Sequence, residues 1–185
     1  MSSVRASLPV RQVCALHEHH PTARLVVFVP RPQLGMALQQ AVARELGATA
    51  GLTVTTVEGY ARTLATLPLQ VDGYTELDAG PRFFLTAHAI ERLDDNQRDA
   101  LTGGQPLSGM IGPLARTMAL LREHDISPDA YRAQSSETSR QAAQAAVLTH
   151  YEQLLHEDQL YDDALLFETA EKQVRTKETD LLTTV

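Results

Sequence analysis

Residues 24–65 read RLVVFVPRPQLGMALQQAVARELGATAGLTVTTVEGYARTLA, and this stretch decides the fold. An apolar run, Leu25–Val29, is typical of a strand, and apolar residues spaced four apart then predict a helix that ends at Gly47. A second β-type run leads into another helical pattern from Glu58. Strand–helix–strand–helix is the repeat of an open parallel sheet, so the sequence predicts an α/β fold. Ligands of such sheets bind at the carboxyl ends of the strands, which here are Pro30–Arg31 and Thr55–Val57.

The remainder of the chain has helical periodicity. Helices are expected from Pro81 to about Leu101, from Gly109 to His124, from Ser136 to Glu157 and from Asp162 onward. Ser127 followed by Pro128 predicts the start of a short helical turn, and Asp162 is the expected cap of the last helix. Residues 181–185 are apolar and β-prone, and they predict the start of another strand. We therefore expect an α/β core portion over residues 1–78, a helical insertion subdomain over 79–174 and a return to the core sheet over 175–185. Because that last strand stands unfinished, we expect the chain to be a piece of a longer protein.

Composition favours a folded protein and limits its partners. Hydrophobic residues make up 43% of the chain, and its only cysteine, Cys14, cannot form an intrachain disulfide, which favours a reducing compartment. The net charge of −7 argues against wrapping nucleic acid by bulk electrostatics, although it does not exclude a local basic edge. No apolar run approaches the roughly 20 residues that span a membrane, and the N-terminus lacks the apolar segment of a secretory signal. We expect a cytoplasmic protein with no membrane partner.

Patterns that carry enzyme chemistry are missing from the sequence. A nucleotide-binding sheet would carry G-x-x-x-x-G-K-[ST] at the place where residues 6–16 read ASLPVRQVCAL, without Gly or Lys. ATP and Mg²⁺ are therefore not expected as cofactors. Acidic pairs stand at predicted helix ends, where capping explains them, and His17, His19 and His20 lack the supporting ligands of a metal site. We expect no catalytic residue and no metal ligand in this chain.

The strand ends hold the candidate binding residues. Arg31 follows the first strand between Pro30 and a second proline, and this position suits a contact with an anion. Thr55, Thr56 and Tyr60 follow the second strand, where hydroxyls and a helix N-terminus can hold a phosphate and an aromatic ring can stack on a base. The alternative interpretation is that the threonines cap the helix and Tyr60 packs in the core.

These two strand ends resemble a pair of motifs in a known family. VVFVPR at 26–31 and TTVEGYA at 55–61 are similar to the paired strand-end motifs of UvrD/Rep-type superfamily 1 helicases and of AddB/RexB-type helicase–nuclease subunits, with the same helix between them. Further on, LYDDALL at 160–166, with Ala170, resembles the end of the helical insertion of that family. Pro30-Arg31 and Glu58-Gly59 replace the TFTN and HS of active UvrD-type enzymes, so the AddB/RexB-type branch fits better.

The resemblance implies an incomplete parallel sheet of the P-loop-NTPase (RecA-like) type with a large all-α insertion, in the N-terminal part of a helicase–nuclease of the PD-(D/E)XK class. In the family these motifs touch single-stranded DNA, which marks Pro30, Arg31, Thr56 and Tyr60 as candidate contacts. Because the phosphate loop is degenerate, the implied function is an ATPase-inactive domain that binds single-stranded DNA or scaffolds the nuclease in DNA repair or recombination.

The partners implied are single-stranded DNA and either the remainder of the same chain or a helicase partner subunit. A hypothesis of a different class is a protein–protein docking module with no nucleic-acid contact of its own, which the net negative charge favours. An independent small enzyme is a third hypothesis, and the absence of a catalytic constellation counts against it.

Overall fold

The computed structural model describes residues 8–47, 50–133 and 140–183, and the chain divides into two compact units, residues 1–63 and 64–185. The N-terminal unit contains α1 (Leu8–His19), β1 (Leu25–Phe28), α2 (Pro32–Leu46), β2 (Leu52–Thr55) and the first turns of α3 (Val57–Val71). The strand–helix–strand–helix order predicted for residues 24–65 is therefore confirmed, including the helix end at Gly47, whose φ of 74° is left-handed.

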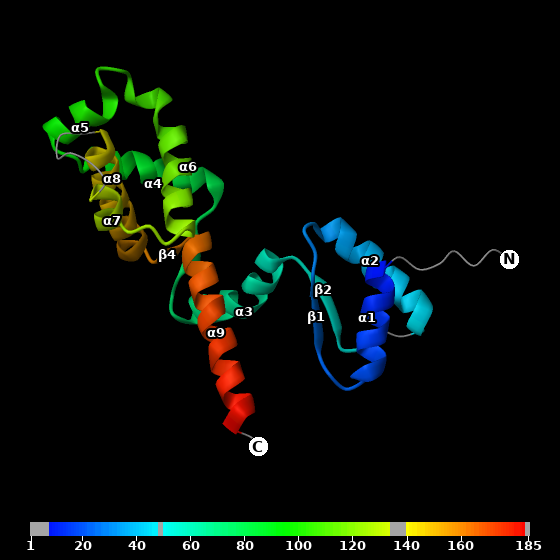
Figure 1. The fold of residues 1–185 in the computed structure, drawn as a ribbon. Helices are drawn as coiled ribbons and strands as arrows, with labels where there is room; N and C mark the ends of the chain where they lie inside the picture. Colours follow the sequence, from blue (N-terminus) through cyan, green and yellow to red (C-terminus); the bar gives the residue numbers. More distant parts are fainter. Residues whose placement is uncertain (1–7, 48–49, 134–139, 184–185) are drawn as a thin grey trace. The chain divides into compact units, whose positions relative to one another are not determined.

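The strands β1 and β2 pair in parallel, from Leu25 opposite Leu52 to Phe28 opposite Thr55. Alternate strand residues pack with α1 and α2 around a small core that contains Val10, Val13, Val42 and Leu52. Figure 1 shows both helices on the same side of the strand pair. The alternating residues Val26, Phe28, Thr53 and Thr55 therefore lie on the other face of the sheet.

The C-terminal unit is a helical bundle. It contains β3 (Thr75–Glu76), α4 (Ala79–Glu91), α5 (Asp95–Thr102), the short 3₁₀ turn η1 (Leu107–Gly109), α6 (Ile111–Glu123), α7 (Pro128–Arg132), α8 (Arg140–Glu157), β4 (Leu160–Tyr161) and α9 (Asp163–Thr183). Its main core is formed by buried residues of α4, α5, α6 and α8. The central helix is α8, which buries residues on every side, from Ala143 to Leu155, as a helix surrounded by others must.

The expected fold class is wrong. Instead of an α/β fold with a RecA-like sheet and an all-α insertion, the described residues are mostly helical and form two separate two-stranded parallel sheets, β1–β2 and β3–β4. The short strands Thr75–Glu76 and Leu160–Tyr161 pair with each other. Among the described residues, each sheet therefore contains only two strands.

The strand expected from residue 181 is also wrong. Leu181–Thr183 belong to α9, while residues 184–185 lie outside the described part of the chain. The ion pairs Glu168–Lys172 and Glu171–Arg175, spaced four apart, support the helix ahead of this segment. Extending an existing helix fixes one residue for each new hydrogen bond, so three β-prone residues do not stop it.

One helix boundary in the C-terminal unit differs from the expectation, and another confirms it. The single helix expected from Pro81 to about Leu101 is interrupted, because Asp94 and Gln97 form a reciprocal capping box that starts α5. The start predicted at Ser127-Pro128 is confirmed, since Ser127 Oγ accepts a hydrogen bond from the Ala130 amide at 3.2 Å. Among the described residues no helix combines the length and the apolar character needed to cross a bilayer.

Glycines bring both helix N-termini of the N-terminal unit close to the strand ends. A methyl group at Gly35, in α2, would lie 3.2 Å from Val29 Cγ2, and one at Gly59, in α3, would lie 2.7 Å from Thr55 Oγ1. Alanine at Gly59 gains about 1 kcal/mol of helix propensity, but the overpacking costs about 1–3 kcal/mol. The overpacking cost is therefore expected to exceed the gain in helix propensity, so that the substitution lowers stability.

We expect Gly59→Ala to destabilise the N-terminal unit by about 1 kcal/mol, which corresponds to about fivefold faster exchange of its strand amides. Hydrogen exchange of the amides of residues 25–28 and 52–55 measures this. Gly112→Ala in α6 is the matched control, because among the described residues no atom outside its chain neighbours and the nearby backbone of its own helix lies within 4 Å of the new methyl group. Slower exchange of these strand amides in Gly59→Ala would show that α3 does not lie this close to Thr55.

Candidate functional site

The parallel pairing brings the predicted residues together at one edge of the sheet. Pro30 and Arg31 follow the end of β1 after Val29, and Thr55 is the last residue of β2. The Val29 amide donates a hydrogen bond to the Thr55 carbonyl oxygen at 2.9 Å, which continues the strand register to this edge. The two candidate segments therefore lie at the same end of the strand pair.

 

Arg31 is presented to solvent at the start of α2. It is the N-cap residue, with extended backbone angles (φ −146°, ψ 141°), and its side chain makes no capping hydrogen bond. Pro30 and Arg31 are both exposed, and Arg31 has no ion-pair partner among the described residues. The first turn of α2 contains no acidic residue. The positive end of this helix and the Arg31 guanidinium are therefore both available to an anion.

The start of α3 is already occupied by the protein's own groups. Thr56 Oγ1 accepts a hydrogen bond from the Gly59 amide at 3.0 Å, so Thr56 caps the helix. Glu58 stands in the first turn and pairs with Arg62 at 3.1 Å. The capping interpretation thus holds for Thr56, and the carboxylate of Glu58 makes this helix start less suited to a phosphate than that of α2.

An aromatic pair completes the strand-end site. The rings of Phe28 and Tyr60 meet edge to face, with centroids 5.5 Å apart and an interplanar angle of 74°. Phe28 is 51% exposed, whereas Tyr60 is half-buried. Tyr60 therefore supports an exposed ring at the strand end, and Thr55 lies opposite Phe28 in the register.

Phe28 is the residue of this site that the sequence did not single out. Phe28 lies in the apolar run Leu25–Val29, so the sequence alone does not distinguish it from core residues. The signal that identifies it is the period of two: Leu25 and Val27 pack toward α1 and α2, so Phe28 does not share their face.

Comparisons with protein-family models, curated protein sequences and solved structures found no match to this chain. The functional assignment therefore depends on the geometry and charge of its own residues.

The charge of the sequence divides unevenly between the two units. Residues 1–63 carry six arginines and three glutamates, for a net charge of +3. Residues 64–185 carry 10 basic and 20 acidic side chains, for a net charge of −10, so the two parts together give the total of −7. The strand-end site thus belongs to a basic unit, although the whole chain is acidic.

The described residues of the chain hold no group of three His, Cys, Asp or Glu side chains placed to bind a metal ion. The acidic pairs have structural roles instead. Asp94 caps α5 through the Gln97 amide at 2.8 Å, and Asp162 caps α9 through the Leu165 amide at 3.2 Å.

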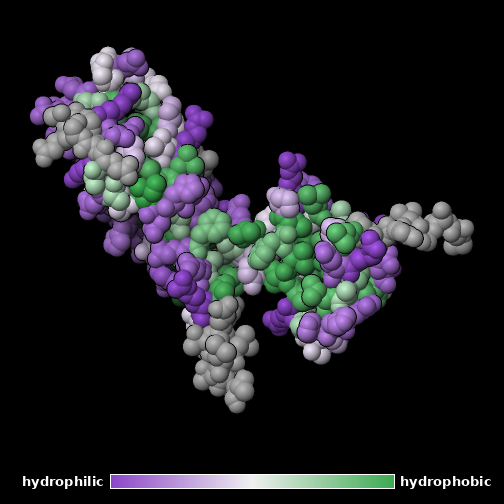
Figure 2. Space-filling model, in the orientation of Figure 1, coloured by the Kyte–Doolittle hydropathy of each residue, from purple (hydrophilic) through white to green (hydrophobic). Residues whose placement is uncertain are grey.

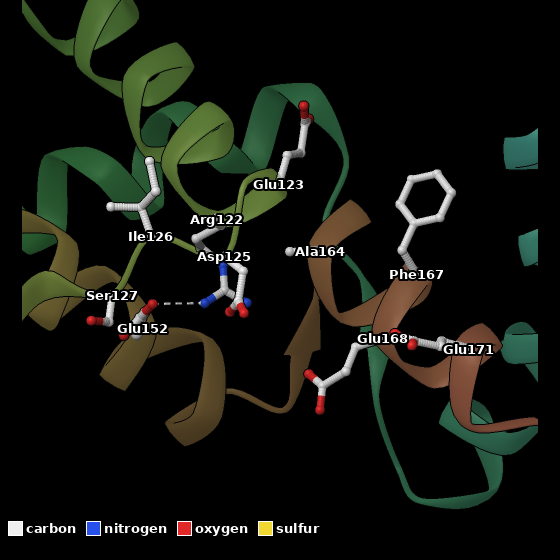
Figure 3. A pocket seen from close by; sticks show the side chains of 10 residues that line it. All are labelled: Arg122, Glu123, Asp125, Ile126, Ser127, Glu152, Ala164, Phe167, Glu168 and Glu171. Atoms are coloured by element: carbon white, nitrogen blue, oxygen red, sulfur yellow. Dashed lines mark hydrogen bonds and ion pairs between the residues drawn. The ribbon is translucent and has the colours of Figure 1, made fainter. Parts of the chain in front are cut away.

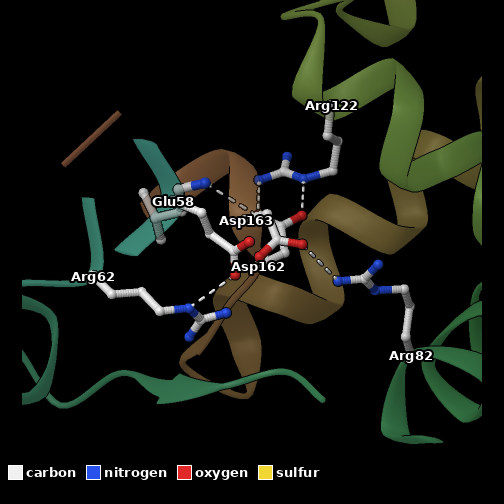
Figure 4. Close-up of polar contacts among 7 residues, drawn as sticks. Glu58, Arg62, Arg82, Arg122, Asp162 and Asp163 are labelled. Carbon is white, nitrogen blue, oxygen red and sulfur yellow. Dashed lines mark hydrogen bonds and ion pairs between the residues drawn. The ribbon is translucent and has the colours of Figure 1, made fainter. Parts of the chain in front are cut away.

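Asp162 also belongs to an ionic cluster in the C-terminal unit (Figure 4). Arg122, from α6, contacts both of its carboxylate oxygens, with Nη2 3.1 Å from Oδ1, and donates through Nη1 to Glu152 of α8 at 3.0 Å. Arg82 of α4 pairs with Asp163 of α9 at 3.3 Å. Asp162 is only 6% exposed. The cluster joins four helices, and every charge in it has an opposite charge beside it, so its role is to hold the bundle together.

The phenol of Tyr151 lies in the core beside this cluster. Its side chain is fully buried, and its hydroxyl has no hydrogen-bond partner among the described residues. Burial raises the pKa of this phenol well above its ordinary value of 10, and the negative charge of Asp162 raises it further. Above pH 10 the unfolded chain therefore loses this proton while the folded chain keeps it, so the folded state loses stability as pH rises.

We expect Tyr151→Phe to be at least as stable as the parent chain at pH 7, because it removes a buried hydroxyl without a partner. At pH 11 the variant should gain about a further 1.4 kcal/mol relative to the parent. Urea unfolding at both pH values, followed by circular dichroism, measures the difference. A stability difference that stays constant between pH 7 and pH 11 would contradict the expected ionisation.

Proposed function

We propose that the N-terminal unit binds single-stranded DNA at the carboxyl ends of β1 and β2. The observation that carries this proposal is the exposed ring of Phe28, supported by Tyr60 and followed three residues later by the exposed Arg31 at the start of α2. An aromatic face and a nearby cation are the two groups that sequence-tolerant binding of single strands needs.

In this proposal a base stacks on Phe28, and a neighbouring phosphate is bound by Arg31 and the N-terminus of α2. Stacking of a base on an aromatic side chain contributes about 1–3 kcal/mol. The phosphate is directed to α2 because its first turn has no acidic residue, while α3 carries Glu58. The net charge of +3 over residues 1–63 favours approach of the strand.

The choice of DNA is supported by the order of motifs that resembles AddB/RexB-type helicase–nuclease subunits. The proposal accordingly assigns the chain to a protein of DNA repair or recombination, in which it acts without ATP. Pro30, Thr55 and Thr56 shape the strand ends in this proposal, and Thr56 acts through its capping hydrogen bond.

A second candidate function is protein docking at the same surface. The strands β1 and β2 form a sheet of only two strands, and each has one edge with no partner among the described strands. Figure 2 shows hydrophobic surface in the part of the N-terminal unit where these strands lie. Because parallel sheets are usually covered on both faces, this surface is also suited to a protein partner.

We expect Arg31→Gln to weaken binding of a fluorescein-labelled oligothymidine about tenfold and to lower the salt slope by about 0.7, the value for one phosphate contact on a single strand. Fluorescence anisotropy over a range of salt concentrations measures both. Arg44→Gln is the matched control, since it makes the same charge change in the last turn of the same helix. The DNA proposal is wrong if the parent chain fails to bind at low salt or if both variants lose affinity equally.

The substitution Phe28→Leu separates the two candidate functions. Leucine keeps apolar area but lacks a ring, so we expect a loss of about 1–3 kcal/mol in binding the same oligonucleotide, which is about five- to 150-fold. Phe28→Tyr keeps the ring and should bind within about twofold of the parent chain. Equal oligonucleotide binding by the leucine variant and the parent would favour docking of a protein over base stacking.

A further inference from the structure

A groove in the C-terminal unit has a chemistry unlike that of the strand-end site. It has a volume of about 530 Å³, within the range of about 300–1,000 Å³ that ligand pockets occupy. Its lining comes from α6 and the α6–α7 connection, from α8 and from α9. Figure 3 shows Phe167 and Glu168 on α9, with Asp125 and Ile126 on the α6–α7 connection.

Apolar and acidic side chains both line the groove. Ile126, Ala164 and Phe167 provide apolar surface, and Phe167 remains 39% exposed. The carboxylates that line it are those of Glu123, Asp125, Glu152, Glu168 and Glu171. An aromatic ring beside carboxylates is suited to a ligand that is both apolar and cationic.

The charges of the rim leave a negative excess. Arg122 is the only basic residue among the described residues of the lining, and Asp162 and Glu152 already neutralise it. Glu168 and Glu171 pair with Lys172 and Arg175 on the same helix. Glu123 and Asp125 have no ion-pair partner among the described residues. The lining therefore disfavours an anion, and a cation has two carboxylates available to it.

We propose that this groove docks a basic amphipathic segment of a partner protein. Such a segment would place an apolar side chain against Phe167 and Ile126 and a lysine or arginine beside Glu123 and Asp125. Charge complementarity favours a basic occupant, because residues 64–185 carry a net charge of −10. Among the described lining residues no basic side chain is without an acidic partner. The proposal is independent of DNA binding by the N-terminal unit.

The experiment uses the full chain and a fluorescein-labelled helical peptide of leucine, lysine and arginine, with a charge-reversed peptide of leucine and glutamate beside it. We expect the basic peptide to bind and the acidic peptide not to bind, with affinity that falls as salt is added. Absence of binding by the basic peptide at low salt, or equal binding of both peptides, overturns the proposal. Full displacement by spermine at equal charge overturns it in favour of a simple polyamine site.

Variants of the chain locate the binding. We expect the double variant Glu123→Gln/Asp125→Asn to weaken peptide binding about tenfold, and Phe167→Ala about fivefold. Asparagine suits position 125, because the backbone there has a φ of 53° and asparagine tolerates left-handed conformations. Glu91→Gln/Asp99→Asn is the control, since it makes the same charge change at exposed positions that do not line the groove.

The control should keep peptide affinity within about twofold of the parent chain. Equal weakening by the control and the groove variant would show that net charge, not the groove, binds the peptide. Circular dichroism and thermal unfolding establish that each variant is folded. Oligonucleotide binding should stay unchanged in the groove variants, which separates failure of this proposal from failure of the strand-end site.

Discussion

The parallel pairing of β1 with β2 is the constraint on which the N-terminal unit depends. Parallel pairing places the ends of both strands at one edge, so Pro30–Arg31 and Thr55–Thr56 meet there although a whole helix separates them in sequence. A sheet of two strands has little stability of its own. Its stability comes from α1 and α2, which pack on one face, while the other face keeps Phe28 exposed.

The C-terminal unit depends on a different interaction, the contact of Arg122 with Asp162. The same carboxylate accepts a hydrogen bond from the Leu165 amide. One buried side chain therefore both caps the start of α9 and connects it to α6. Removing one partner of a buried ion pair typically costs about 3–5 kcal/mol, because the other charge is left uncompensated. These contacts account for the acidic pair Asp162-Asp163 by structural roles.

The division into two units changes the meaning of the net charge. A chain of net charge −7 is a poor candidate for nucleic-acid binding when it is treated as one body. A basic unit of +3 and an acidic unit of −10 are suited to partners of opposite character. The same division separates the strand-end site, for which we propose single-stranded DNA as the ligand, from the acidic groove, for which we propose a basic protein segment.

The sequence by itself determined the local elements between residues 24 and 65 and the caps at Ser127 and Asp162, because periodicity and capping are decided by neighbours along the chain. It also placed Arg31 and Tyr60 at strand ends. Only the tertiary structure decided that β3 pairs with β4, that residues 181–183 continue α9 and that Phe28 is exposed beside Tyr60. The physical reason is that strand partners and exposed faces depend on contacts between distant residues, which local patterns do not encode.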